Sequence, residues 1–287
     1  MAADKTSDLA KDDMEQQTGY KRSDWYLPDI TEVGELAREV LEKYSHISPD
    51  EVVPHVLAIR ERAWKVWNYP CIGGFRFLDL SIAKQELYPS VLERLRTKGE
   101  TFLDLGCCFA QDLRKLVFDG APPERLYGSD LRDDFIKLGY ELFKDKETLK
   151  SKFITGDVFD FESPLKELHG KVDIIYAASF FHLFDWPQQV AVAKRMVALF
   201  KPTTGCVVFG RHRGSLAPGD YQARANPSGK MYRHNAESFQ KLWKEIGDET
   251  GTEWKVTAVL HDDPPAIRPR SMEDRNARGM TYQVEKV

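Results

Sequence analysis

The chain has 287 residues, and its 41 lysines and arginines against 45 aspartates and glutamates give a formal charge of −4. A chain of this length buries a full-sized core without disulfide or metal staples. Its acidic balance argues against nucleic acid as the main partner. The longest apolar stretch, near residues 174–181, is too short to cross a bilayer. The four cysteines show no disulfide framework, and we expect a cytoplasmic protein with no membrane anchor and no metal site.

Two segments precede the main body of the chain. Residues 1–24 carry few apolar side chains, so we expect a disordered tail there. Residues 25–100 are predicted to form an N-terminal helical cap, whose first long helix starts at a capping box, SPDE at residues 48–51. Apolar spacing over residues 82–95 predicts a second helix. An aromatic run between the helices is interpreted as partly core and partly the wall of an apolar acceptor pocket: Trp67, Tyr69, Phe75 and Phe77.

Residues 101–287 are predicted to form one α/β core, because β-rich runs alternate with helical stretches. Predicted strands cover residues 102–105, 125–130, 152–157, 172–177 and 206–210. Predicted helices cover residues 111–118, 133–143, 188–200 and 236–246. Two further strands, at residues 254–260 and 280–284, are expected to pair as an antiparallel end of the sheet.

Two long connections, residues 211–233 and 261–279, follow the fifth and sixth predicted strands. Open α/β sheets bind ligands at the carboxyl edge, so we predict that both connections form lids over a site there. Their arginines are interpreted either as solvated loop charge or as a cluster that steers an acidic acceptor: Arg211, Arg213, Arg224, Arg233, Arg268 and Arg270.

The stretch TFLDLGCCFAQD, residues 101–112, is typical of a strand, a turn of small residues and a helix. Such a turn lets a ligand approach the backbone at Gly106, and the helix start offers free N–H groups. Cys108 and Gln111 stand where a dinucleotide fingerprint has its later glycines, which argues against a nicotinamide or flavin cofactor. Cys107 and Cys108 are interpreted as small residues that pack beside a cofactor, since no base that would activate a nucleophile lies near them.

Three aspartates end successive predicted strands. Asp104 lies in an apolar strand, where a carboxylate is unfavourable unless a cationic ligand pairs with it. Asp130 follows at the distance typical of an acid that accepts hydrogen bonds from ribose hydroxyls, and Asp157 ends the third strand. Three carboxylates at one sheet edge suit a ligand with an ammonium group, a ribose diol and an exocyclic amine. S-adenosylmethionine carries all three groups.

The motifs LDLGC, GSDL, GDVFD and VDIIYAASFFHLF, in this order, resemble those of class I S-adenosylmethionine-dependent methyltransferases over about residues 101–209. Cys108 and Ala110 replace glycines of the family's GxGxG loop. The resemblance implies a Rossmann-like α/β fold with a seven-stranded sheet, mostly parallel with one antiparallel strand, behind the N-terminal helical cap.

The same resemblance implies a cofactor site, residue by residue. Asp104 and Gly106 would hold the methionine end, with Cys107 beside them. Asp130 would bind the ribose, and Leu131 would lie against the adenine. The adenine edge would meet Asp157 and the backbone of Val158, and Ala177 would line the floor near the methyl group.

Three longer stretches resemble a fungal group that methylates polyketide–terpenoid hybrids on the carboxyl group of prenylated dimethylorsellinate-type acids: WNYPCIGGFRFLDL, GCCFAQDLRKLVFDGAP and YRHNAESFQKLWKEIGDETG. This narrower resemblance implies an S-adenosylmethionine-dependent O-methyltransferase of secondary metabolism that forms a methyl ester on a lipophilic acidic meroterpenoid.

Three questions stay open at this point. A phenol or hydroxyl acceptor would need a base, for which His182 or His212 is available, because a phenol has a pKa near 10. His182 is therefore the candidate catalytic residue, although a structural role suits it equally well. A non-catalytic, S-adenosylmethionine-binding regulatory protein is the rival from another class. The sequence does not decide between a monomer and a homodimer.

Overall fold

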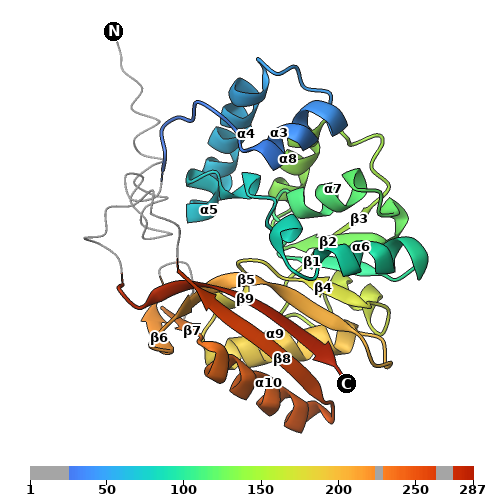
Figure 1. The fold of residues 1–287 in the computed structure, drawn as a ribbon, viewed down its shortest axis with the longest axis vertical. Helices are drawn as coiled ribbons and strands as arrows, with labels where there is room; N and C mark the ends of the chain where they lie inside the picture. The colour runs from blue at the N-terminus through green and yellow to red at the C-terminus, as the bar shows by residue number, and fades with distance from the viewer. Residues whose placement is uncertain (1–25, 224–228, 263–273) are drawn as a thin grey trace.

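The computed structural model describes residues 26–223, 229–262 and 274–287, and Figure 1 shows how they are arranged. The predicted tail at residues 1–24 lies outside the described residues. The N-terminal cap contains α3 (Glu35–Glu39), a π-helical turn η1 (Val40–Tyr44), α4 (Val52–Val66) and α5 (Pro70–Gly73). Two 3-10 turns, η2 (Arg76–Leu78) and η3 (Ser81–Lys84), and helix α6 (Tyr88–Thr97) lead into the sheet. The cap boundary at residue 100 stays a prediction.

The predicted start of the first long helix, with Pro49 as its first residue, was wrong by three residues. Helix α4 begins at Val52, and the SPDE segment is a turn in which the Glu51 N–H donates to the Ser48 carbonyl at 2.9 Å. The Ser48 hydroxyl donates to the Glu51 carboxylate at 3.1 Å, so these side chains bond each other instead of capping backbone N–H groups. The second helix also starts late, because residues 81–84 form the 3-10 turn η3.

The core is a seven-stranded sheet with the order β3-β2-β1-β4-β5-β9-β8. Five strands run parallel, and β9 is antiparallel to its neighbours β5 and β8, which confirms the predicted fold class. The strands are β1 (Phe102–Leu105), β2 (Leu126–Asp130), β3 (Lys152–Thr155), β4 (Ile174–Tyr176), β5 (Val207–Ser215), β8 (Trp254–His261) and β9 (Ala277–Lys286). The connecting helices are α7 (Gln111–Phe118), α8 (Asp133–Phe143), α9 (Trp186–Leu199) and α10 (Ala236–Thr250).

The connection predicted at residues 211–233 is largely regular structure, so the long-loop prediction was wrong. Strand β5 continues to Ser215 because β9 pairs with it along its whole length, from Val207 opposite Glu285 to Ser215 opposite Ala277. Beyond it, β6 (Gly219–Gln222) and β7 (Lys230–Arg233) form a separate antiparallel hairpin. The polar RHRGS sequence hides this strand extension. Most of the second connection, residues 263–273, lies outside the described residues.

Alternate residues of each strand face two different helical layers. Leu103 and Leu105 point into a core shared with α9 and α10, whereas Phe102 and Tyr176 belong to a core shared with α6, α7 and α8. A third cluster joins the cap to α8, and Figure 1 shows the blue cap helices at the opposite end of the molecule from α10. By the alternation of a strand, Asp104 lies on the α6 and α7 side.

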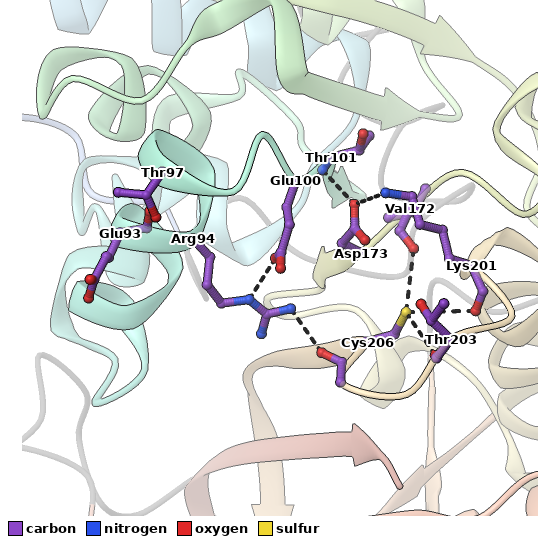
Figure 2. A network of polar contacts seen from close by, with 11 residues as sticks. Glu93, Arg94, Thr97, Glu100, Thr101, Val172, Asp173, Lys201, Thr203 and Cys206 are labelled. Atoms are coloured by element: carbon purple, nitrogen blue, oxygen red, sulfur yellow. Dashed lines mark hydrogen bonds and ion pairs between the residues drawn. The ribbon is translucent and has the colours of Figure 1, made fainter.

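A polar network closes the amino edge of the sheet (Figure 2). The buried Asp173 carboxylate accepts hydrogen bonds from the Thr101 N–H at 2.8 Å and from the Lys201 ammonium at 2.6 Å. Beside it, the Arg94 guanidinium bonds the Glu100 carboxylate at 2.6 Å and the Gly205 carbonyl at 2.8 Å. At this edge, charged side chains form hydrogen bonds with one another and with the backbone N–H of Thr101 and the backbone carbonyl of Gly205.

Candidate cofactor and active site

The turn after β1 is fixed on the neighbouring strand by its own backbone. The N–H groups of Gly106 and Cys107 both donate to the Ser129 carbonyl, at 2.8 and 3.0 Å. Gly106 has a φ of +76°, and a Cβ there would lie 2.6 Å from Cδ2 of Phe180. Cys108, at a φ of +52°, also adopts the left-handed conformation. Only a residue without a side chain fits at Gly106, because the Phe180 ring fills the space that a Cβ would need.

Asp130 is held in one orientation by the same turn. Its Oδ2 accepts the Cys108 N–H at 2.9 Å, and its Oδ1 accepts the Arg132 N–H at 2.9 Å. Burial raises the pKa of Asp130, and these N–H donors oppose the rise. The neighbouring Leu131 exposes 60% of its surface. An oriented carboxylate next to an exposed apolar side chain suits a ribose joined to a flat base.

Asp104 is a buried carboxyl group without a hydrogen-bond partner among the described residues. The residue is 3% exposed, and its Oδ2 has no hydrogen-bond partner in the described part of the chain. Burial, followed by the charges of Asp112 and Asp130, holds the pKa of Asp104 well above its usual range. Asp112 is buried too, but its Oδ1 accepts the Ile82 N–H at 2.8 Å. The Gln111 Oε1 is a second buried acceptor without a partner among the described residues. A cationic group bound here would satisfy these acceptors, so the residues fit an ammonium-bearing cofactor.

The third acid stands apart from this cluster. Strand β3 ends at Thr155, and Asp157 is an exposed residue whose Oδ1 accepts the N–H of Phe159 at 2.9 Å. The Gly156 N–H donates to the Asp130 carbonyl at 3.1 Å, which keeps this turn next to the end of β2. The structure therefore brings Asp104 and Asp130 into one acidic group with Asp112, and places Asp157 and the buried Val158 on the turn beside them. Sequence reasoning did not single out Asp112, although its place in the first turn of the helix after the glycine turn was visible.

The floor beyond β4 is built around Ala177. Its N–H donates to the Phe209 carbonyl at 3.0 Å, and its carbonyl accepts the Tyr282 hydroxyl at 2.6 Å. A Cβ at Gly210 would lie 2.5 Å from the Ala177 carbonyl oxygen, so glycine permits this close approach. Strands β5 and β9 thus fix the position of Ala177.

Two histidines, the half-buried His182 and the buried His212, lie just past this floor. His182 is in the 3-10 turn η6 (Phe181–Leu183), and its ring centroid is 6.3 Å from that of His212 on β5. The Nδ1 of His182 and both ring nitrogens of His212 are buried with no hydrogen-bond partner among the described residues. Burial lowers the pKa of His212 to about 3 and, with the neighbouring positive charges, holds that of His182 well below its usual range. Both rings are neutral at physiological pH.

The aromatic run of the cap is divided between two environments. Phe75 and Phe77 are buried in the cap core, at 6% and 3% exposure. Trp67 is half-buried, and the guanidinium carbon of Arg132 lies 3.9 Å from its ring centroid. Burial and then the charge of Asp130 raise the pKa of Tyr69. Trp67 and Tyr69 therefore lie beside Asp130 and the neighbouring Arg132, so the cap contributes side chains to this end of β2. The sequence did not indicate that Trp67 and Tyr69 lie close to Asp130.

Comparison with known proteins agrees with this geometry. Residues 25–78 match the family described as a meroterpenoid methyltransferase N-terminal domain, and residues 102–203 match one described as a methyltransferase domain. The O-methyltransferase phiE of a fungal species is 45% identical over 260 residues, with 89% of this chain and 86% of the relative covered. The asnovolin E/chermesin D methyltransferase nvfJ of Aspergillus novofumigatus is 43% identical, with 79% and 81% covered. The chain belongs to the meroterpenoid methyltransferase family.

A further relative, the O-methyltransferase atr3 of Stereocaulon alpinum, is 46% identical over 86% of this chain and 71% of its own length. Among solved structures, a 1,6-didemethyltoxoflavin-N1-methyltransferase of Burkholderia thailandensis shares the fold, with a TM-score of 0.50 and 14% identity over 82% of this chain and 90% of that one. The predicted enzyme class, an S-adenosylmethionine-dependent O-methyltransferase, is confirmed, which decides against the non-catalytic alternative. No helix in the described residues is long and apolar enough to span a membrane.

Proposed function

We propose that this methyltransferase forms a methyl ester on the carboxyl group of a lipophilic, acidic polyketide–terpenoid intermediate of fungal secondary metabolism. The resemblance to relatives such as nvfJ supports the class of acceptor. A cytoplasmic location is part of this proposal, and the four free cysteines support it.

Within this proposal, the acidic group at the ends of β1 and β2 binds the cofactor. Asp104 and Gly106, with Cys107, hold the methionine end, and Asp130 orients the ribose. Exposed Leu131 packs on the adenine, whose edge meets Asp157 and the Val158 backbone. Ala177 lines the floor near the reacting atoms. When bound, S-adenosylmethionine supplies a methyl group on a positively charged sulfur, which is the electrophile.

The state of the two histidines favours a carboxylate acceptor. A histidine that acts as a general base is usually oriented by an acceptor on its second nitrogen. The Nδ1 of His182 has no such partner in the described structure, and the pKa values of both His182 and His212 are lowered. A phenol with a pKa near 10 would transfer its proton to these rings only with difficulty, whereas a carboxylic acid with a pKa near 4 is already ionised. We propose that His182 contacts the acceptor as a hydrogen-bond donor, while positioning and exclusion of water supply most of the rate.

Product analysis tests this function directly. The purified protein is incubated with methyl-labelled S-adenosylmethionine and a prenylated aromatic acid. The mass of the product is measured by mass spectrometry before and after mild alkaline hydrolysis. We expect a gain of one methyl group that alkali removes. An alkali-stable methyl group would indicate an ether or a carbon acceptor and would refute the ester assignment.

Replacement of His182 separates the ester mechanism from the phenol alternative. For a carboxylate acceptor, His182→Gln keeps a hydrogen-bond donor and should lower kcat by about tenfold or less, since one neutral hydrogen bond contributes about 1 kcal/mol. Loss of general-base catalysis would lower kcat by about 100- to 10,000-fold and remove the acidic limb of the pH–rate profile. A fall in that range on an acid acceptor would overturn the role proposed here.

A further inference from the structure

Arg211 lies beside the segment that follows Ala177, the residue proposed above to line the floor near the reacting atoms. It is on β5, and its carbonyl accepts the Ser179 N–H at 2.6 Å, two residues beyond Ala177 on the adjoining segment. Strand alternation puts its side chain on the same side of the sheet as Phe209 and Tyr176, under the cap, rather than on the side that His212 shares with α10. The side chain is 24% exposed, so a ligand can reach it.

The contacts of Arg211 are too long to be those of a structural arginine. Its Nη2 lies 3.5 Å from the Asp79 carboxylate and its Nη1 3.4 Å from the Ser179 hydroxyl. Charge-assisted hydrogen bonds normally measure about 2.7–2.9 Å. In this same chain the buried Arg114 forms a two-pronged pair with Asp145 at 2.7 and 2.9 Å.

The carboxylate that pairs with Arg211 is shared. Asp79 also lies 3.5 Å from Nε of Arg76, so one carboxylate serves two guanidinium groups. The charges of Arg211, Arg213 and Arg233 each contribute to lowering the pKa of the neighbouring His182, so a positive potential reaches this end of β5. A partly exposed guanidinium with a shared counter-ion attracts an anionic ligand.

We propose that Arg211 binds and orients the carboxylate of the methyl acceptor, and that Asp79 holds its guanidinium in place until the acceptor arrives. The inference rests on the proposed ester-forming function and adds the residue that selects for an acid. The planar guanidinium has donors in a fork that matches the two carboxylate oxygens. Replacing the long contacts to Asp79 and Ser179 with a two-pronged pair would leave one carboxylate oxygen directed along β4 toward Ala177.

Three variants of the full chain test this role with the acceptor acid and with its primary carboxamide as a competitive inhibitor. Arg211→Gln should raise the KM for the acid by about 10- to 100-fold, the range for a lost hydrogen-bonded charge, and should abolish the preference for acid over amide. Arg211→Lys should restore part of that preference because the charge remains without the fork. Asp79→Asn should lower the KM several-fold, because it removes the competing carboxylate.

Calorimetry with S-adenosylhomocysteine shows whether Arg211 binds the carboxylate of the acceptor or the methionyl carboxylate of the cofactor. We expect its Kd to change less than twofold in Arg211→Gln, and the same in the control Arg94→Gln, which removes a similarly buried arginine at the opposite edge of the sheet. A Kd weakened as much as the KM would assign Arg211 to the cofactor and overturn the proposal. So would an unchanged KM and acid preference in both Arg211→Gln and Asp79→Asn. If the wild-type protein makes no alkali-labile product, the proposed function itself fails, whatever the Arg211 variants do.

Discussion

At the amino edge of the sheet the carboxylate of Asp173 has an N–H and an ammonium donor, whereas at the carboxyl edge Asp104 has a buried oxygen with no partner in the described structure. Both residues are less than 10% exposed, at 8% and 3%. The same residue type is therefore part of the fold at one edge and an unsatisfied group at the other. Buried polar groups normally find partners, so the unsatisfied edge marks the surface that a ligand completes.

The strongest test of this comparison replaces one aspartate with asparagine at each edge of the sheet. Asp104→Asn should weaken binding of S-adenosylhomocysteine by about 10- to 100-fold, because a charged partner of its ammonium group is lost. At a pH above the raised pKa of Asp104, the same variant should also raise the free energy of unfolding of the free protein by about 1 kcal/mol, because an unpaired ionised carboxylate is no longer buried. Calorimetry and chemical unfolding measure the two effects.

Asp173→Asn is the matched control. It should lower the free energy of unfolding by about 1–2 kcal/mol through its weakened bond to Lys201 and leave the Kd for S-adenosylhomocysteine unchanged. If both variants changed the free energy of unfolding and the Kd in the same direction, Asp104 and Asp173 would not have the different roles described here.

The second prediction concerns pH. Burial raises the pKa of Asp104 in the free protein, and a bound ammonium group favours the ionised carboxylate and so lowers that pKa. Binding therefore requires loss of a proton at any pH below the raised value. The affinity for S-adenosylhomocysteine should be constant above that pKa and fall by about tenfold for each pH unit below it. Titration calorimetry in buffers of different ionisation enthalpy counts the released proton. Asp104→Asn should remove the dependence; a dependence that persists would belong to another group.

A smaller effect is expected from glycines at the two edges. Gly106 and Gly170 have similar φ values, +76° and +67°, but a Cβ meets Phe180 at the first and nothing within 4 Å at the second. Gly170→Ala should lower stability by about 1 kcal/mol, the strain of a left-handed alanine, without changing kcat. Gly106→Ala should cause the same backbone strain and should also displace Phe180, so its stability loss should be larger and its kcat measurably lower. Equal stability losses and equal kcat values in the two variants would show that Phe180 moves freely.

The sequence predicted the parts of this molecule that depend on short-range pattern. The strands around Phe102 and Ile174, the glycine turn at Gly106 and the helix after it were visible because apolar runs and small residues mark them locally. The antiparallel end of the sheet was also predicted, since no helix separates its two strands. The three strand-end aspartates indicated S-adenosylmethionine, and the family resemblance implied the same cofactor.

The rest depended on contacts between distant residues. The extension of β5 through Arg211 was missed because its pairing partner lies about 70 residues away and supplies the regularity that RHRGS lacks. The SPDE segment failed as a helix start because Ser48 and Glu51 satisfy each other. The approach of Tyr69 to Asp130 follows from packing of the cap on α8, which no local spacing encodes.

The insertion of β9 between β5 and β8 has a consequence for folding order. Strand β8 leaves the ribosome before β9, yet its place in the sheet exists only once β9 has paired with β5. Until then β5 presents an unpaired edge to β8, and since β5 and β8 run parallel in the native sheet, a direct pairing of the two would mimic a normal neighbour relation. Such long-range pairing is slow. A chain in which β8 paired directly with β5 would exclude β9, and with it Tyr282, whose hydroxyl donates to the Ala177 carbonyl.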